Sequence, residues 1–202
     1  LIEKPFFFCK NKSLSWHLDK AKFFLRSKKI INLNLSNYLF GDIYKKHKDL
    51  KKINIRKFFF SFSTSGNCKY KFIILDLMPH FFSIIQRITP CNHVKIISRK
   101  INKYSCNLVI KIDDYICYIK LSENQKIRDL SFGFDDFIVS RKQIPHKNTI
   151  KNFLYNKKHN FKIRTPNPLT NFINSYYDKN GSNSIDRKFI YNNFKQTLKT
   201  YF

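Results

Sequence analysis

Glycine, alanine and acidic residues are scarce in this sequence. Its 202 residues include four glycines, a single alanine at Ala21, and 13 Asp and Glu against 39 Lys and Arg. The chain contains neither the P-loop sequence G-x-x-x-x-G-K-[ST] nor the dinucleotide-binding sequence G-x-G-x-x-G, and it also lacks the zinc-protease sequence H-E-x-x-H. No motif therefore indicates any of these three classes of enzyme.

Cysteine is present in an odd number and without regular spacing. Five cysteines at scattered positions do not form a disulfide framework. We expect them to be buried as small hydrophobic residues in a reducing compartment. Cys91 and His93, taken with Cys106 and Cys117, do not have the spacing of a common structural zinc site.

The two pairs of adjacent carboxylates are the remaining candidates for chemistry. Asp113-Asp114 and Asp135-Asp136 could bind a divalent ion or act as an acid and a base. Adjacent residues of a strand point to opposite faces, so sequence neighbours rarely converge on one site. We expect these residues at turns or beside lysines, and we predict no catalytic residue, no cofactor and no metal.

Long hydrophobic runs are also missing. The best candidate for a membrane span, residues 72–88, contains Asp76, Pro79, His80 and Arg87 and is too short. The sequence therefore predicts no membrane partner.

Positive charge is what the chain has in excess. The formal net charge is +26, and the charge is mostly lysine, since there are only eight arginines. A compact protein this cationic repels itself and requires a polyanion, of which nucleic acid is the commonest. The basic run over residues 45–57 is interpreted as an RNA contact rather than a solvated helix face.

The skew in composition indicates an organelle. Phe, Ile, Lys, Asn and Tyr, which are abundant, have A/T-rich codons, whereas the scarce Ala and Gly have G/C-rich ones. The chain starts at Leu1, its only methionine is Met78, and no cleaved targeting peptide is recognisable. A non-standard start codon, processing or truncation each explain this start, and we expect a mitochondrial location.

The chain is expected to fold as one domain with an extension. Hydrophobic residues make up 43% and aromatic residues 17%, enough to bury a core. Residues 1–66 are predicted to be a basic, aromatic N-terminal extension, and the Ser/Thr/Gly-rich residues 61–67 a linker. Residues 67–202 are predicted to be an α+β RNA-binding domain with an insertion at about 102–140.

Periodicity predicts the elements of that domain. Strands are expected over 70–77 and 94–101, with a helix over 79–89 between them, so that the three form a β-α-β unit. A hairpin over 107–121 should turn at Asp113-Asp114. Further elements are expected as a helix over 15–28, short strands over 137–140 and 160–165, a turn over 178–184 and a final helix capped by Ser184.

The stretch over residues 141–174 is the candidate binding site. Two extended segments flank residues 156–160, which have no acidic side chain, and such a ribbon can insert between RNA helices. The residues predicted to contact RNA are Arg141, Lys142, His146, Lys147, Lys151, Lys157, Lys158, His159, Lys162 and Arg164.

This stretch resembles the small-subunit ribosomal protein ten family. Ile144, Pro145, Thr149, Ile150 and Phe153 match the family's I-P-x-P-T region loosely, and Phe161, Ile163, Arg164, Thr165 and Leu169 match its F-E-I-R-T region more closely. Lys162 replaces an acidic residue of that motif, and Pro166 and Pro168 interrupt what is basic in the family. Residues 70–101 would supply the family's first strand, helix and second strand. A competing register uses residues 108–112 as the first strand.

The resemblance implies a ferredoxin-like α+β sheet with two helices on one face and a protruding basic β-ribbon. It implies a structural role in the small subunit of a mitochondrial ribosome, with ribosomal RNA and neighbouring ribosomal proteins as partners and no small-molecule substrate. The alternatives are another organellar ribosomal protein, a subunit of an organellar membrane complex, or a nucleic-acid enzyme.

Overall fold

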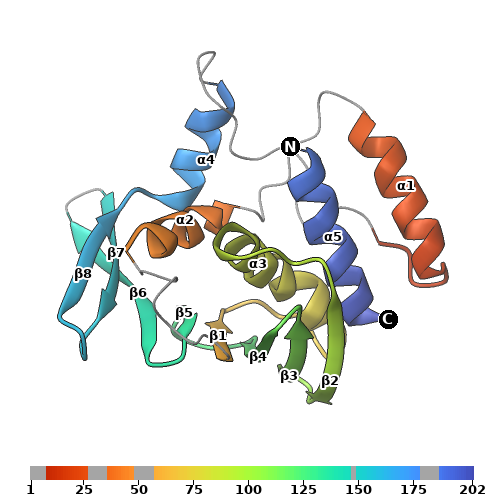
Figure 1. Cartoon of the computed structure of the whole chain (residues 1–202), viewed down its shortest axis with the longest axis horizontal. Coiled ribbons are helices and arrows are strands. Elements are labelled where there is room, and N and C mark those ends of the chain that lie inside the picture. Colours follow the sequence, from red (N-terminus) through yellow and green to blue (C-terminus); the bar gives the residue numbers. More distant parts are fainter. Residues whose placement is uncertain (1–7, 27–35, 48–56, 147–148, 178–186) are drawn as a thin grey trace.

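A single mixed sheet of eight strands organises the molecule. The computed structural model describes residues 8–26, 36–47, 57–146, 149–177 and 187–202 (Figure 1). The strands are β1 (Lys57–Ser63), β2 (Val94–Ile101), β3 (Ser105–Ile112), β4 (Tyr115–Ser122), β5 (Asp129–Phe134), β6 (Phe137–His146), β7 (Thr149–Asn156) and β8 (Phe161–Thr165). Their order across the sheet is β2-β3-β4-β1-β5-β6-β7-β8.

Strand β1 lies inside the sheet although it comes first in the sequence. It pairs in parallel with β4 and antiparallel with β5, and every other pair of neighbouring strands is antiparallel. The chain leaves β1 through a helix, enters the sheet at the edge strand β2, and returns by β3 and β4 to the side of β1. One long connection therefore produces the one parallel pair.

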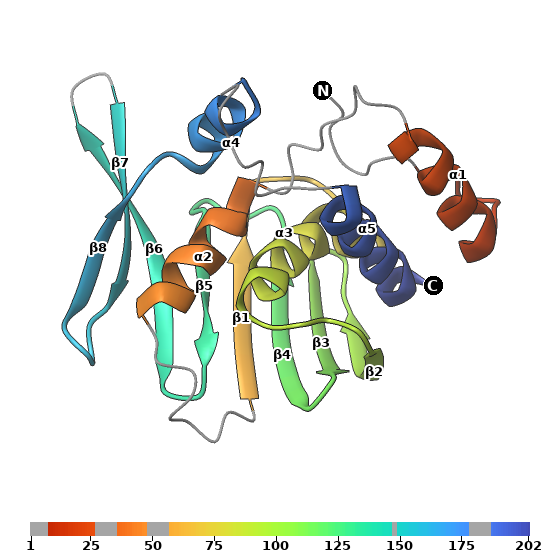
Figure 2. The same cartoon turned by 45° about the horizontal axis from the view of Figure 1, so that its top comes forward.

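The helices lie on one side of the sheet (Figure 2). They are α1 (Leu14–Arg26), α2 (Tyr38–His47), α3 (Phe72–Ile88), α4 (Pro168–Tyr177) and α5 (Arg187–Tyr201). Helix α3 packs directly on the sheet, and α2 and α5 flank it. Helix α1 lies outside α5, where Ala21 and Leu198 belong to a second, smaller hydrophobic cluster.

Alternation along β1 fixes which face is covered. Phe58, Phe60 and Phe62 are buried against α3, and the rings of Phe58 and Phe60 meet Phe81 edge-on at 6.0 and 5.3 Å. The intervening residues Lys57, Phe59, Ser61 and Ser63 therefore point to the other face. Buried aromatic rings contribute much of the apolar area of a core. These phenylalanines therefore supply apolar area that alanine, which is scarce in this chain, does not.

The strand predicted over 70–77 is wrong. Residues 72–88 form one helix that continues through Pro79, so the predicted β-α-β unit does not exist. A continuous apolar run suits a buried helix as well as a strand, and α3 is buried on nearly all sides between the sheet and its neighbouring helices. The carbonyl oxygen of Pro79 accepts a hydrogen bond from Asn193 Nδ2 at 2.8 Å, which ties α3 to α5.

Other local predictions are confirmed. Strands β3 and β4 form the expected hairpin, with Asp113 at φ 47° in its turn. The strands expected over 94–101, 137–140 and 160–165 correspond to β2, β6 and β8, and the helix expected over 15–28 corresponds to α1. The final helix is also confirmed as α5, in which Ile190, Phe194 and Leu198 are buried.

The ferredoxin-like fold is corrected. The observed sheet has eight strands instead of a small sheet under two helices, and strands β3 to β6, predicted as an insertion, run through its centre. The predicted linker over 61–67 begins inside β1. The division of the chain at residues 66 and 67 stays a prediction about independent folding, although β1 and α2 share the core with later elements.

Some predictions fall outside the described residues. They are the part of the basic run over 48–56, the turn over 178–184 and the cap at Ser184. Within the described ranges, none of the helices combines the length and apolarity that crossing a membrane requires.

Candidate functional site

An apolar row crosses the face of the sheet opposite the helices. The strand register aligns Val109 with Tyr118 and Tyr118 with Phe59, on β3, β4 and β1. Phe59 is aligned in turn with Gly133 on β5, and Gly133 with Ile138 on β6. Gly133 has no side chain, so the row is interrupted between Phe59 and Ile138.

The centre of this row is a stacked aromatic pair. The rings of Phe59 and Tyr118 lie 5.3 Å apart between centroids and 15° from parallel. They line a concavity of about 350 Å³ together with Val109, Ile138, Ser61 and Lys120. Tyr118 keeps 39% of its surface exposed, which is unusual for a large aromatic side chain in the middle of a sheet.

Polar and cationic side chains lie on both sides of the apolar row. On one side, register aligns Asn107, Lys120, Ser61, Ser131 and Ser140. On the other side it aligns Lys95, Lys111, Ile116 and Lys57. We call this surface of β1, β3, β4, β5 and β6 the open face, and its chemistry suits a ligand with a planar ring and negative charge.

The residues predicted to contact RNA are divided by the structure. Lys142, Lys162 and Arg164 gather around Phe153 on the open side of β6, β7 and β8. Lys162 Nζ lies 5.0 Å from the centre of the Phe153 ring, within range of a cation–π interaction. Lys151 follows on the same side of β7, opposite Ile144.

The predicted tip residues are at the turn between β7 and β8. Lys158 Nζ and His159 Nε2 lie 3.9 and 3.6 Å from a carboxylate oxygen of Asp136, so this acidic residue is a local partner of basic residues, as expected. Lys157 is exposed in the same turn. His146 ends β6 opposite Thr149, and Lys147 lies outside the described residues.

Arg141 is separated from all of these. It faces the helix side of β6, because Phe137 and Val139, two and four residues earlier, are buried in the core. Sequence reasoning therefore grouped it with residues of the opposite face.

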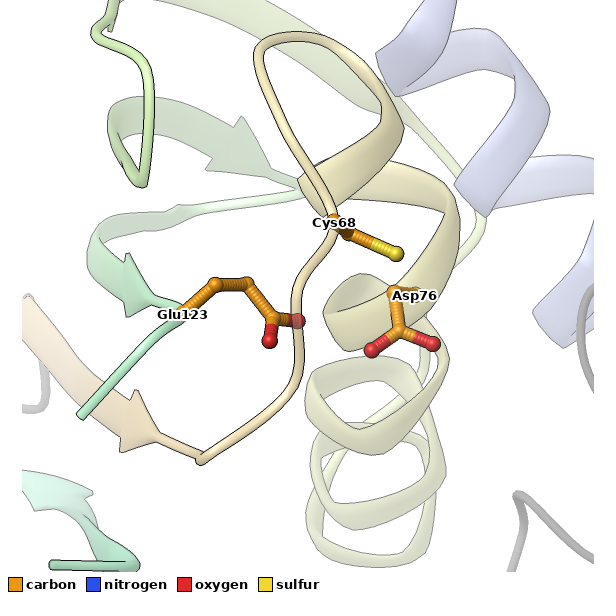
Figure 3. A group of neighbouring side chains, drawn as sticks. All are labelled: Cys68, Asp76 and Glu123. Carbon is orange, nitrogen blue, oxygen red and sulfur yellow. The ribbon is translucent and has the colours of Figure 1, made fainter. Parts of the chain in front are cut away.

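A third group of reactive side chains lies where β1 leads into α3. The ligand atoms of Cys68, Asp76 and Glu123 are all within 4.8 Å of one another (Figure 3). Glu123 is fully buried, and one of its carboxylate oxygens accepts a hydrogen bond from Thr64 Oγ1 at 3.0 Å. A thiol and two carboxylates are donor types found in divalent metal sites, and these three residues are the described ones that could hold such an ion.

Sequence reasoning missed both the open face and the Cys68 group. The alternation in 57–63 (KFFFSFS) is the signal for β1, but the preceding basic run and the Ser-rich end masked it. Cys68, Asp76 and Glu123 are separated by 8 and 47 positions in the sequence, so no spacing motif joins them. The cysteines considered for zinc are not a cluster in the described part of the chain, where Cys106 and Cys117 are buried core residues.

Comparison with known proteins shows likeness of fold but not of sequence. No protein-family model matches the chain, and no curated protein matches its sequence. A 3-ketoreductase from Actinomadura kijaniata, solved with TDP-benzene and NADP, has a TM-score of 0.63 at 10% identity, over 96% of this chain and 66% of its own. The UDP-N-acetylglucosamine 3-dehydrogenase of Acidithiobacillus ferrooxidans has a TM-score of 0.57 at 11% identity, over 98% and 68%.

A third similar structure is a putative oxidoreductase from Magnetospirillum magnetotacticum, with a TM-score of 0.58 at 13% identity over 98% of this chain and 70% of its own. The chain thus spans about two-thirds of the length of each of these structures. Identities this low show a shared fold and no more.

These findings overturn the assignment to the ribosomal protein ten family. The chain shares the fold of these solved oxidoreductases over nearly its whole length. Residues Phe161 to Thr165, which match the ribosomal motif, form the edge strand β8 of its eight-stranded sheet. The ribosomal role and the RNA and protein partners that depended on this assignment are therefore wrong. The expectations of no enzyme and no small-molecule substrate are wrong as well. The alternatives named from the sequence find no support either, and the mitochondrial location stays a prediction.

Proposed function

We propose that this chain is the substrate-binding part of an oxidoreductase and that it binds a nucleotide-linked, negatively charged substrate on the open face. The observation that carries the proposal is the stacked pair of Phe59 and Tyr118, on a fold found in oxidoreductases. The pair lies between a polar row that contains Lys120 and a row that contains Lys111 and Lys57. Two of the similar proteins act on or contain nucleotide-linked compounds by name, a UDP-sugar and TDP-benzene.

The aromatic pair supports the base-binding half of this proposal. An exposed tyrosine ring offers a flat surface, and stacking of a nucleobase on an aromatic ring contributes about 1–3 kcal/mol. The concavity of about 350 Å³ that the pair lines provides room for a ring system beside it.

The flanking rows support the phosphate-binding half. Lys120 and Ser61 are aligned across β4 and β1 on one side of the concavity, and Lys111 and Lys57 flank it on the other. Ammonium and hydroxyl groups donate hydrogen bonds to phosphate oxygens, and charged hydrogen bonds of this kind are roughly twice as strong as neutral ones. Electrostatic attraction from a chain of net charge +26 adds to this at low salt.

The nicotinamide dinucleotide that the fold suggests does not fit the turn from β1 to α3. A dinucleotide pyrophosphate needs free N–H groups at the start of a helix and a glycine whose backbone it can approach. Here the N–H groups of Phe72, Ile73 and Ile74 donate to carbonyl oxygens within the turn, and the carboxylate of Glu123 lies against Gly66. We therefore derive no step of the reaction through that cofactor.

Isothermal titration of the full chain with UDP-N-acetylglucosamine tests the proposal. We expect saturable binding that weakens as salt is raised, and a Phe59→Ala, Tyr118→Ala double variant that binds roughly tenfold more weakly or worse. Tyr155→Ala is the matched control, because Tyr155 is a similarly exposed aromatic residue of the same sheet outside the concavity.

Two results would reject the proposal. One is the absence of saturable binding by both UDP-N-acetylglucosamine and TDP. The other is binding of polyuridylate many times tighter than of either nucleotide, with loss on the same double substitution, which would make the open face a polynucleotide surface.

A further inference from the structure

A set of buried hydrogen-bond donors lies on the helix side of β6, β7 and β8. Nε and Nη2 of Arg141, Nδ2 of Asn152 and Oγ1 of Thr165 are inaccessible to solvent and have no hydrogen-bond partner among the described residues. Asn152 and Thr165 are only 1% and 4% exposed. Buried polar groups are almost always paired in folded proteins, so several orphan donors in one region require an explanation.

The strand register brings these donors together. Asn152 is aligned with Thr165 on β8 and with Gln143 on β6, so the three side chains form a row across the strands. Arg141 is two residues from Gln143 on the same face and is a diagonal neighbour of Asn152. Diagonal neighbours are roughly 7–8 Å apart, within reach of a long arginine side chain.

The side-chain amide of Asn152 has a defined orientation. Gln143 Nε2 donates to Asn152 Oδ1 at 3.0 Å. That bond uses the carbonyl oxygen of the Asn152 amide and leaves its NH₂ group as the unpaired donor. Arginine has donors only, and the hydroxyl of Thr165 can donate as well, so the whole set can supply hydrogen bonds to one acceptor.

Two arginines and one carboxylate lie in this region, so positive charge is in excess among the charged groups that act on Arg141. Burial, and to a smaller extent the charge of Arg128, lowers the pKa of Arg141 to about 10, against the opposing effect of Asp129. Arg128 lies one residue before β5, with its guanidinium 5.5 Å from the centre of the Phe62 ring. Burying part of an arginine beside a second arginine costs free energy unless an anion or several acceptors face it.

We propose that Arg141, Asn152 and Thr165 form a binding site for an oxyanion, the phosphate or carboxylate group of a small ligand. The site lies on the opposite side of the sheet from the open face, in the region where α2 and α4 lie (Figure 2). Arg141 presents two N–H groups to the anion, and Asn152 and Thr165 each add one donor. Gln143, the cross-strand partner of Asn152, and Arg128 are both exposed, so the site lies next to the protein surface.

The site has a consequence for stability that a purely structural arginine would not show. Without an anion, the buried charge of Arg141 destabilises the folded protein, so replacing it with a neutral side chain of similar length should leave stability equal or higher. With an anion, binding to the folded state alone should raise stability, and the same replacement should remove this gain.

Thermal unfolding of the full chain with inorganic phosphate or acetate, in chloride buffers of constant ionic strength, tests the proposal. We expect phosphate to raise the midpoint of the wild type and of Lys142→Met by similar amounts, and that of Arg141→Met by clearly less, since the open face is intact in all three. Lys142→Met is the matched control, because it removes the same charge from the next residue, on the other face of β6. Thr165→Val should give a smaller rise with phosphate than the wild type.

The acetate series assigns the ligand. A rise with phosphate alone indicates a phosphoryl group, and a rise with both anions indicates that the site also accepts carboxylates; either result supports the site. Two results would overturn it: no rise with either anion, or a rise in Arg141→Met equal to that of the wild type. Because the variants leave Phe59 and Tyr118 intact, failure here does not bear on substrate binding at the open face.

Discussion

The hydroxyl oxygen of Tyr44 lies 3.0 Å from the carbonyl oxygen of Phe137, to which it donates, and 2.8 Å from the backbone nitrogen of Phe134, from which it accepts. One side chain of α2 thus satisfies two backbone groups at the turn between β5 and β6. Burial of this hydroxyl is also the main reason why the pKa of Tyr44 is raised above its ordinary value. The bonds fix α2 on the half of the sheet that carries Arg141.

Removing this hydroxyl should destabilise the fold without changing its shape. Tyr44→Phe keeps the ring, which is 1% exposed, but leaves a buried N–H group and a carbonyl group unpaired. We expect a loss of about 1–3 kcal/mol in the free energy of unfolding, measured by urea titration. Tyr191→Phe is the control, since Tyr191 lies on α5 and is half-buried. An equal, small effect of both substitutions would show that the Tyr44 bonds contribute little.

Gly133 should be nearly irreplaceable. Its φ is 155°, and an added Cβ would overlap the carbonyl oxygen of Phe137 and approach the Cα of Ile138, both of which are backbone atoms. Because the backbone of the β5–β6 hairpin cannot yield as a flexible side chain can, we expect Gly133→Ala to destabilise the protein by about 2 kcal/mol or more. Thermal unfolding would measure this, and a change in midpoint no larger than that of an exposed substitution such as Lys126→Ala would contradict it.

Gly66 should tolerate replacement by alanine better than Gly133 does. An added Cβ would overlap the carboxylate of Glu123, which is the end of a side chain and can move. We expect Gly66→Ala to cost about 1 kcal/mol in the wild type and less in a Glu123→Ala background, since the overlap is then absent. A double-mutant cycle by urea unfolding measures this coupling, and a coupling of zero would place the strain elsewhere.

Sequence reasoning succeeded where the deciding interactions are local. The hairpin of β3 and β4 was predicted because alternation on both sides of Asp113-Asp114 identifies strands and turn together. It failed where burial overrides periodicity: residues 72–77 have the apolar density of a strand, but α3 is surrounded by core on nearly all sides, so its residues need no polar face.

The topology and both candidate sites depend on contacts that the sequence does not display. Phe59 meets Tyr118 only because β1 pairs in parallel with β4 after a connection through α3, β2 and β3. Arg141 was predicted to contact RNA because of its charge, which is visible in the sequence. That it faces the core side, next to Asn152, follows from the register of β6 and β7. The ribosomal assignment therefore rested on a short local motif, whereas the fold is determined by strand pairings between distant parts of the chain.

The buried thiols should make the fold sensitive to alkaline pH. Burial raises the pKa of Cys106 from 9.0 to about 11 and that of Cys117 from 9.0 to about 12. The folded state thus holds these protons more tightly than the unfolded state. The stabilisation is fully present below pH 9, the unfolded value, and is lost as pH rises toward 11 and 12. Arg141, whose pKa is lowered to about 10, acts in the opposite sense, but only above that pH.

Urea unfolding at a series of pH values around and above 9 would measure the effect of the thiols. We expect the free energy of unfolding to fall with pH in the wild type and to fall less steeply in Cys117→Ala, although the variant starts from a lower value because it loses packing. Cys9→Ala serves as the control, since Cys9 lies outside the sheet, before α1. Parallel curves for wild type and Cys117→Ala would mean that the alkaline loss of stability comes from other groups.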